Sequence, residues 1–190
     1  MKKTLLLLLA MAGSSMGQII AGFGYADAEI DFPSGIDDIT LGVFYASLGT
    51  EINTQSDDFR FVPELRVGSG TKDYSASVPV VVEGEAGVLE GLGIEYFVSL
   101  SLRAEVHQND TTDFFLPAGA YAFVNPTFTV ISLEASGSRN GVEGSLTTTT
   151  EKFGVGVGLG YNFTEIASAE VYLEFYEDVT VYGVGAKFRF

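Results

Sequence analysis

The sequence predicts an all-β protein, an antiparallel up-and-down transmembrane β-barrel of eight strands. Successive segments alternate between apolar residues and residues that are polar or glycine, and this period of two is typical of strands. The polar face mixes large charged side chains with rows of glycine, which suits a narrow, crowded interior better than a face open to water. The chain also begins with a segment typical of export. Together these features favour a barrel with lipid outside and polar groups inside.

The first residues predict a cleaved signal peptide over residues 1–17. Lys2 and Lys3 precede an apolar run over residues 5–11, and Ser15 and Gly17 stand at the spacing expected before a cleavage site. A membrane-spanning helix needs about 20 apolar residues, so this run is too short to be one. We therefore expect residues 18–190 to form a single barrel domain in the membrane. The absence of cysteine agrees with an exported protein that folds without disulfides.

The charge of the chain limits its partners. The formal net charge is −15, and removal of the two lysines with the signal peptide lowers it to −17. No basic patch is visible, so we expect no nucleic-acid partner. A chain that enters a membrane without an apolar helix must close its strands into a barrel, because every backbone group then has a partner.

The N-terminal half predicts three strands separated by polar segments. The first covers residues 19–28 and is followed by an acidic loop, and the second covers residues 39–50, where both faces are apolar and the orientation stays open. The third covers residues 59–70, with Arg60, Glu64 and Arg66 facing inward. The following stretch, residues 71–90, is predicted to be a long acidic loop that extends the neighbouring strands as a hairpin.

The middle of the chain predicts two longer strands, over residues 92–106 and 116–130. In the first, Leu92 and Ile94 belong to the apolar face that looks outward, whereas Glu95, Arg103 and Glu105 look inward. In the second, the pattern changes phase at residues 130–131, which predicts a β-bulge. Asn125-Pro126 interrupts this strand with a residue that cannot donate to a ladder. A turn there and another at residues 97–99 would give ten strands, the alternative to eight.

The last three strands show the clearest alternation, over residues 153–163, 168–176 and 182–190. The glycines of the first, at positions 154, 156, 158 and 160, are expected to leave room for Glu170, Tyr172, Glu174 and Tyr176 of the next strand. A turn at residues 177–178 places Glu170 opposite Gly185 or Lys187. We expect Glu170 to form an ion pair with Lys187 or Arg189 inside the barrel.

The inward-facing charges are predicted to fill the interior as a structural network of compensating ion pairs, because buried charges require partners. Its predicted members are Arg60, Glu64, Arg66, Glu95, Arg103, Glu105, Glu170, Glu174, Lys187 and Arg189. Eight strands enclose a space that side chains can fill, so this network would leave no wide channel.

Several stretches resemble the small outer-membrane β-barrels of Gram-negative bacteria, the OmpA-like and OmpX-like porin family. They are VPELRVGSG, YFVSLSLRAE, NPTFTVISLEASG, GVGVGLGYNFTEIASAEVYLEF and VYGVGAKFRF. The resemblance implies location in the outer membrane, with its lipid and lipopolysaccharide as surroundings. It also implies that Tyr182, Phe188 and Phe190 of the last strand form a signal for the barrel assembly machinery. It implies little about activity.

The function that the sequence favours is a non-enzymatic barrel that acts structurally or through surface contacts. Its outer loops are acidic and are candidates for binding divalent cations, although no EF-hand spacing occurs. The acidic residues are Asp27, Glu29, Asp31, Asp37 and Asp38 in the first loop and Asp73, Glu83, Glu85 and Glu90 in the second. The alternative is a small passive pore for small solutes.

An enzyme is the least favoured function. The chain has one histidine, His107, at a turn far from the outer rim, with Ser101 and Glu105 on the same strand face. The run GVGVGLG looks like a phosphate-binding loop, but it lies within a strand and opens no helix. We expect no catalytic residue, no cofactor and no resident metal.

Overall fold

A computed structural model describes residues 17–30, 39–52, 58–72, 74–82, 85–108, 116–139 and 142–190. These residues form nine strands of one sheet, in which every pairing is antiparallel. The strands are β1 (Ile19–Ile30), β2 (Ile39–Thr50), β3 (Phe59–Lys72), β4 (Tyr74–Val82), β5 (Glu85–His107), β6 (Ala120–Arg139), β7 (Val142–Asn162), β8 (Ala167–Phe175) and β9 (Val179–Arg189). Residues 1–16, most of the predicted signal peptide, lie outside the described part.

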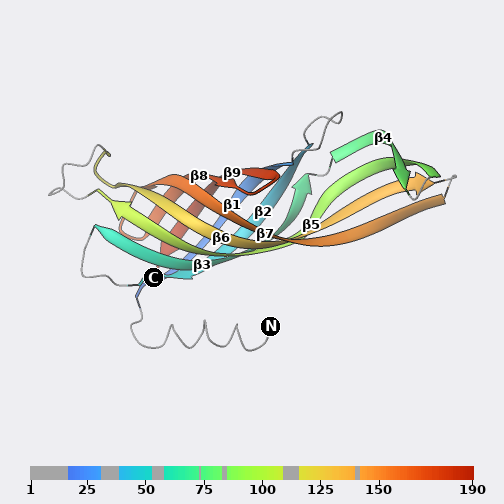
Figure 1. Ribbon diagram of the computed structural model, residues 1–190. Coiled ribbons are helices and arrows are strands. Elements are labelled where there is room, and N and C mark those ends of the chain that lie inside the picture. The colour runs from blue at the N-terminus through green and yellow to red at the C-terminus, as the bar shows by residue number, and fades with distance from the viewer. Residues whose placement is uncertain are drawn as a thin grey trace, which may run out of the picture.

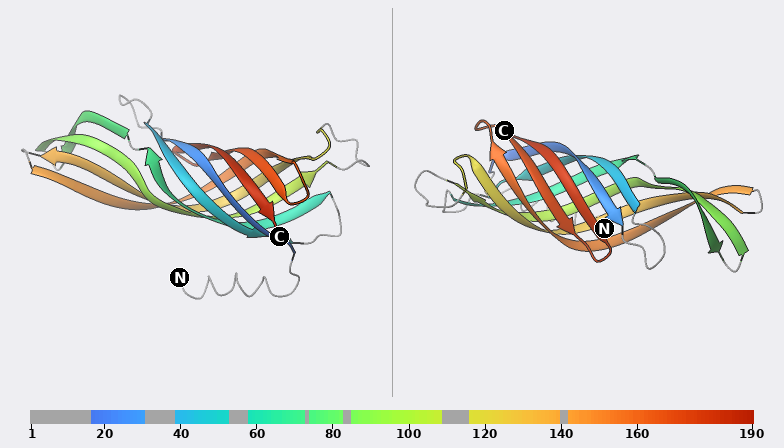
Figure 2. Two further views of the ribbon diagram at one scale, coloured as in Figure 1. Left: turned by 180° about the vertical axis from the view of Figure 1, so that it is seen from behind. Right: turned by 90° about the horizontal axis from the view of Figure 1, so that it is seen from above.

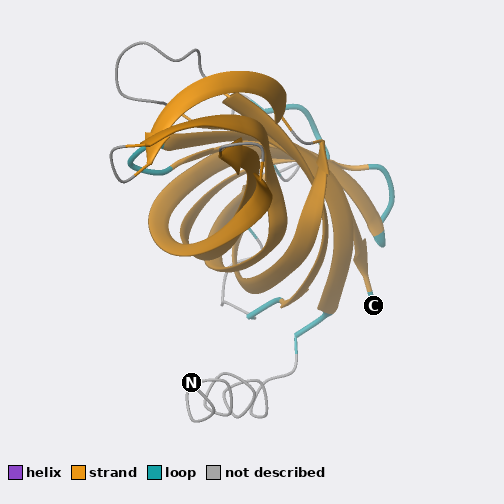
Figure 3. Ribbon diagram, turned by 90° about the vertical axis from the view of Figure 1, so that its right-hand side faces the viewer, coloured by secondary structure: helices purple, strands orange, loops and turns teal. Residues whose placement is uncertain are grey.

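Eight of the nine strands close into a ring (Figures 1 and 3). The strand order is β3-β2-β1-β9-β8-β7-β6-β5-β4, and a further pairing of β3 with β5 closes the barrel. Strand β4 pairs with the N-terminal part of β5 and stays outside the ring. The prediction of an eight-stranded up-and-down barrel is confirmed.

The ten-stranded alternative is wrong because β6 continues through Asn125-Pro126 and β5 continues through residues 97–99. Pro126 lies on the outer face and pairs with Val155 of β7. On its other side the ladder to β5 is interrupted at Leu102 and Arg103 and resumes in the same register. The proline therefore removes local pairing without turning the chain.

One side of the barrel extends into a protruding sheet (Figures 1 and 2). Strands β5, β6 and β7 run well past the ring, and β4 forms a hairpin with β5 there, as the sequence suggested for residues 71–90. Both ends of the barrel chain, Ile19 and Phe190, pair with each other at the opposite end. Within the described residues, no helix is long and apolar enough to cross a membrane.

The outer wall of the barrel is apolar. Phe153 is 68% exposed and Val184 is 53% exposed. The other exposed residues include Phe23, Phe44, Leu48, Leu65, Val67, Leu100, Leu102, Val124, Phe128, Val155, Val157, Leu159, Val171, Phe175, Tyr182 and Phe188. This band matches the outward faces that the alternation predicted. It also settles the orientation of β2, because its even positions Phe44 and Leu48 face outward.

The phase change predicted at residues 130–131 lies elsewhere. Strand β6 pairs without interruption through Val130 and Ile131, whereas the register of the β5–β6 ladder shifts between Ile94 and Tyr96. The extra residue is Glu95 of β5, and it reverses the facing of the residues before it. Leu92 and Ile94 are consequently buried inside, not exposed as predicted, and Glu95 is exposed.

Candidate functional site

The barrel interior has two layers of different chemistry. The layer nearer Ile19 and Phe190 holds buried charged and polar side chains, and we call it the charged layer. Its four carboxylates and four cations balance among the described residues: Glu64, Glu105, Glu170, Glu174, Arg66, Arg103, Lys187 and Arg189. Four strands contribute these charges, because inward positions on β3, β5, β8 and β9 meet across the narrow ring, and β2 and β6 add neutral groups.

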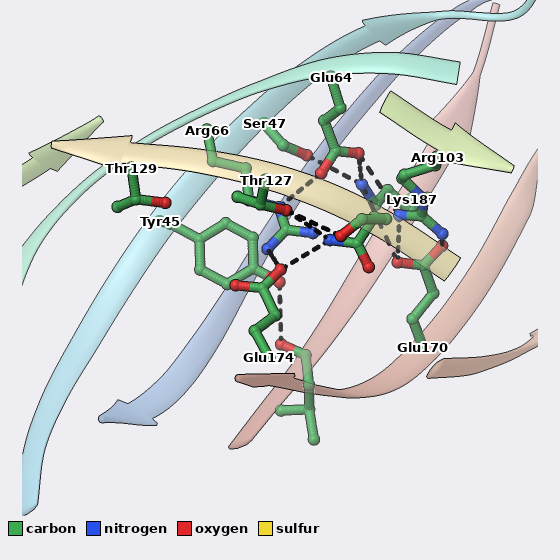
Figure 4. Close-up of polar contacts among 12 residues, drawn as sticks. Tyr45, Ser47, Glu64, Arg66, Arg103, Thr127, Thr129, Glu170, Glu174 and Lys187 are labelled. Atoms are coloured by element: carbon green, nitrogen blue, oxygen red, sulfur yellow. Dashed lines mark hydrogen bonds and ion pairs between the residues drawn. The ribbon is translucent and has the colours of Figure 1, made fainter. Parts of the chain in front are cut away.

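One half of the charged layer is built around Arg66 of β3 (Figure 4). Its Nε lies 2.6 Å from Oε1 of Glu64, and its Nη1 lies 2.6 Å from Oε1 of Glu174. Lys187 of β9 also donates to Glu64. The guanidinium lies 4.8 Å from the centre of the Tyr172 ring, so it is held between carboxylates and an aromatic face. The result is a paired, closely packed centre.

The other half is built around Arg103 of β5. Its two terminal nitrogens bind both oxygens of Glu170, at 2.9 and 2.6 Å, and Nη2 also lies 3.1 Å from Glu105. This bidentate geometry is the strong form of an arginine–carboxylate contact. The predicted partner of Glu170, Lys187, lies 3.9 Å away and is secondary to Arg103. Glu170 stands opposite Gly185, one of the two registers expected.

The remaining residues of the predicted network lie apart from this centre. Arg60 pairs with Glu51 at 3.1 Å at the rim, and its side chain is about one-third exposed. Glu95 accepts a hydrogen bond from Ser132 at 3.0 Å on the outer side of the bulge. Arg189 is buried near the rim and donates to Oδ1 of Asn162 at 2.8 Å. Of the predicted assembly residues, Tyr182, Phe188 and Phe190 all project outward from the wall.

His107 is buried in the same layer. Its Nε2 lies 2.9 Å from Glu105, and its ring stacks on Tyr121 with centroids 4.7 Å apart. No hydrogen bond between His107 and Ser101 occurs in the described part of the chain. His107 and Ser101 are therefore not held together as a base and its nucleophile.

Three aromatic rings of the charged layer occupy the space that glycines leave. A Cβ at Gly160 would collide with Tyr121, one at Gly158 with Phe123, and one at Gly183 with Tyr172. The glycines of β7 thus accommodate side chains mainly of the preceding strand β6, not of β8 as predicted; Tyr176 beside Gly154 is the exception. Inward side chains lean across the wall, and the sequence alone does not say toward which neighbour.

The layer nearer the protruding sheet is apolar, and we call it the apolar layer. It was not predicted, because both faces of β2 are apolar in the sequence and the bulge at Glu95 has no sequence signal. Leu41 is 0% exposed at its centre. The buried residues around it are Ala28, Ile39, Val43, Leu92, Ile94 and Val179, with Ile131, Leu133 and Tyr176 packed against them.

A row of polar atoms inside the barrel has no protein partner. Ser99 Oγ, Ser101 Oγ, Arg103 Nε and Asn125 Oδ1 are buried and unpaired among the described residues. They lie on the neighbouring strands β5 and β6, and such groups are usually satisfied by internal water. The charged layer therefore has the chemistry to hold a few waters, and the apolar layer does not.

The protruding sheet has a free edge. Strand β8 pairs with β7 only up to Val155, so residues 142–154 of β7 have one unpaired side within the described structure. Residues 142–149 are all exposed, with Val142 at 72% and Leu146 at 69%.

Among the described acidic residues, Asp27 accepts a hydrogen bond from Tyr25 at 2.8 Å on the outer wall. Asp31, Asp37, Asp38, Asp73 and Glu83 lie outside the described residues, and the described ones form no metal-binding cluster.

No protein-family model and no curated protein sequence matches this chain. Solved structures do match it. Ail, the attachment invasion locus protein of Yersinia pestis, has a TM-score of 0.55 at 16% identity, over 93% of this chain and 100% of Ail. Ail in complex with the heparin analogue sucrose octasulfate has a TM-score of 0.54 at 17% identity, with the same coverage. Neisserial surface protein A has a TM-score of 0.49 at 13% identity, over 90% and 97% of the two chains.

These similarities concern the fold. They confirm that the chain has the architecture of the small eight-stranded outer-membrane barrels that its sequence resembles.

Proposed function

We propose that this chain is an integral outer-membrane barrel that acts without catalysis, as a structural and surface-interaction protein. One observation carries the proposal: a closed ring has an apolar outer wall and a paired ionic interior. Water would stabilise the reverse arrangement, whereas lipid stabilises this one. The polar end with both termini faces the periplasm, and the protruding sheet faces outward, in contact with lipopolysaccharide at its base.

The free edge of β7 is the part best suited to a partner. Residues 144–150, Gly-Ser-Leu-Thr-Thr-Thr-Thr, hold neither a charge nor a proline, the features that usually protect an edge strand from pairing. An extended segment of another polypeptide can add to such an edge through backbone hydrogen bonds. Ail was crystallised with a heparin analogue, but the exposed charges described here on the protruding sheet include Glu90, Glu134 and Glu143. A polypeptide strand suits this surface better than a polyanion.

A charge on the edge tests this role. Thr148→Lys places a cation on the free strand, and Ser136→Lys places the same charge on β6, which is paired on both sides. We expect cells of a Gram-negative host carrying Thr148→Lys to adhere to an epithelial monolayer several-fold less than cells with the unaltered barrel. Ser136→Lys should leave adhesion unchanged at equal surface levels. Equal adhesion of all three would exclude the edge as the contact surface.

The alternative is a small passive pore, and the unpaired polar atoms of the charged layer favour it, since internal water would satisfy such groups. The apolar layer opposes it, because ions would have to cross a dry segment around Leu41. The refolded barrel in a planar bilayer distinguishes the two. A silent bilayer agrees with the sealed interior, and steady single-channel conductance would make transport the function.

Two further elements belong to the proposal. Tyr182, Phe188 and Phe190 serve as the signal for the assembly machinery, supported by their outward position on the last strand. Divalent cations link carboxylates of the outer loops to lipid phosphates. The position of Asp27 and Glu29 near the C-terminal end of β1 supports this role. The burial of His107 supports the absence of catalysis.

A further inference from the structure

One cation of the charged layer differs from the others in its contacts. Arg66, Arg103 and Lys187 each contact at least one carboxylate within 4.0 Å. Arg189, which is 5% exposed, contacts none among the described residues. Its Nη1 binds the neutral amide of Asn162, and its guanidinium lies 6.0 Å from the Tyr121 ring. These contacts supply hydrogen bonding and polarisability but no negative charge.

A buried guanidinium that no carboxylate contacts directly is costly, because desolvation of its charge is offset only by the more distant carboxylates of the layer. Its Nε is also buried without a hydrogen-bond partner. Both features occur at the same residue, and an anion beside the guanidinium would reduce the first of them.

A pocket of about 440 Å³ opens beside Arg189 at the end of the barrel that holds both termini. Its walls are Gln18, Arg60, Asn162, Thr164, Glu165 and Arg189. The Thr164 oxygen accepts hydrogen bonds from the backbone nitrogens of Ile166 and Ala167, so its hydroxyl hydrogen is available to donate. Arg60 is already paired with Glu51. Among the described residues, the pocket thus offers one guanidinium that no carboxylate contacts directly, together with neutral donors and the Glu165 carboxylate.

We propose that this pocket binds a small carboxylate, with Arg189 as its counterion. The charge balance selects the class of ligand. A carboxylate brings one negative charge, which matches the one unpaired guanidinium. A phosphate brings nearly two, and Glu165 in the wall and Glu51 behind Arg60 would oppose the second. A carboxylate that also carries an amine is accommodated, because Glu165 can face the cation.

The test is a titration of the refolded barrel with sodium acetate, sodium phosphate and sodium chloride at constant ionic strength. The side-chain NMR signals of Arg189 and Asn162 report binding at the site. We expect a saturable shift with acetate, a weaker response to phosphate, and none with chloride. Arg189→Gln should lower the acetate affinity by at least about tenfold. Lys152→Gln, which removes a cation from the other end of the barrel, should leave it unchanged.

Three outcomes would overturn the proposal: no saturable response to acetate, tighter binding of phosphate, or unchanged acetate affinity in Arg189→Gln. A folded, heat-modifiable band on an unboiled gel confirms that each variant is intact. If Arg189→Gln does not fold, Arg189→Lys keeps the charge but removes the planar fork. A smaller loss of acetate affinity is then expected, because the charge remains and the bidentate contact is lost, and an unchanged affinity would contradict direct contact between Arg189 and the carboxylate.

Discussion

The charged layer and the apolar layer fill the same barrel by different means. In the charged layer, the contacts that join different strands pair residues far apart in the sequence, as in Arg103 with Glu170, which are 67 positions apart. In the apolar layer, Leu41 and its neighbours require only complementary shape. The charged layer therefore specifies which strands meet, and the apolar layer closes the interior to water. Substitutions in the two layers should differ in size and in whether a second change can compensate.

The largest effect is expected in the charged layer. Arg103→Met leaves Glu170 and Glu105 without their main cation, and the loss of one partner from a buried pair costs about 3–5 kcal/mol. Urea unfolding of the refolded barrel in detergent measures this loss. Adding Glu170→Gln to Arg103→Met should recover part of it, because the unpaired charge is then removed.

Arg60→Met provides the matched control for that comparison. Arg60 forms a single, partly exposed pair with Glu51 at the rim, and such pairs contribute about 1 kcal/mol or less. A loss of stability in Arg60→Met as large as in Arg103→Met would show that burial does not distinguish these pairs.

A smaller effect is expected in the apolar layer. Leu41→Ala removes buried methyl groups and leaves a cavity, at a cost of about 2–5 kcal/mol. Leu48→Ala on the same strand faces lipid and is 57% exposed, so lipid can fill the space. We expect Leu48→Ala to lose clearly less stability in the same urea measurement. No second substitution in the charged layer should rescue Leu41→Ala, and rescue would indicate that the layers are not independent.

The sequence predicted the wall better than the interior. Alternation located seven of the eight ring strands, because lipid imposes one apolar face over the whole membrane thickness, and β2 was predicted from its apolar run. It failed at Leu92 and Ile94, because one inserted residue at Glu95 reverses the facing without changing composition. It also placed Arg103 in the interior without identifying Glu170 as its partner, since pairing depends on register across the ring. The pocket at Arg189 had no sequence signal, because its walls come from four separate segments of the chain.

The smallest effect is expected where a glycine makes room for the charged layer. A Cβ at Gly160 of β7 would meet the ring of Tyr121, whereas a Cβ at Gly144 of the same strand meets nothing within 4 Å. Gly160→Ala should therefore cost about 1–3 kcal/mol through overpacking. Gly144→Ala should be neutral, or slightly stabilising because the unfolded chain loses freedom. The two variants share chemistry and strand and differ in what lies across the wall, so urea unfolding isolates that difference. Equal stability of the two would mean that Tyr121 moves aside freely, and that the charged layer is less tightly packed than its contacts indicate.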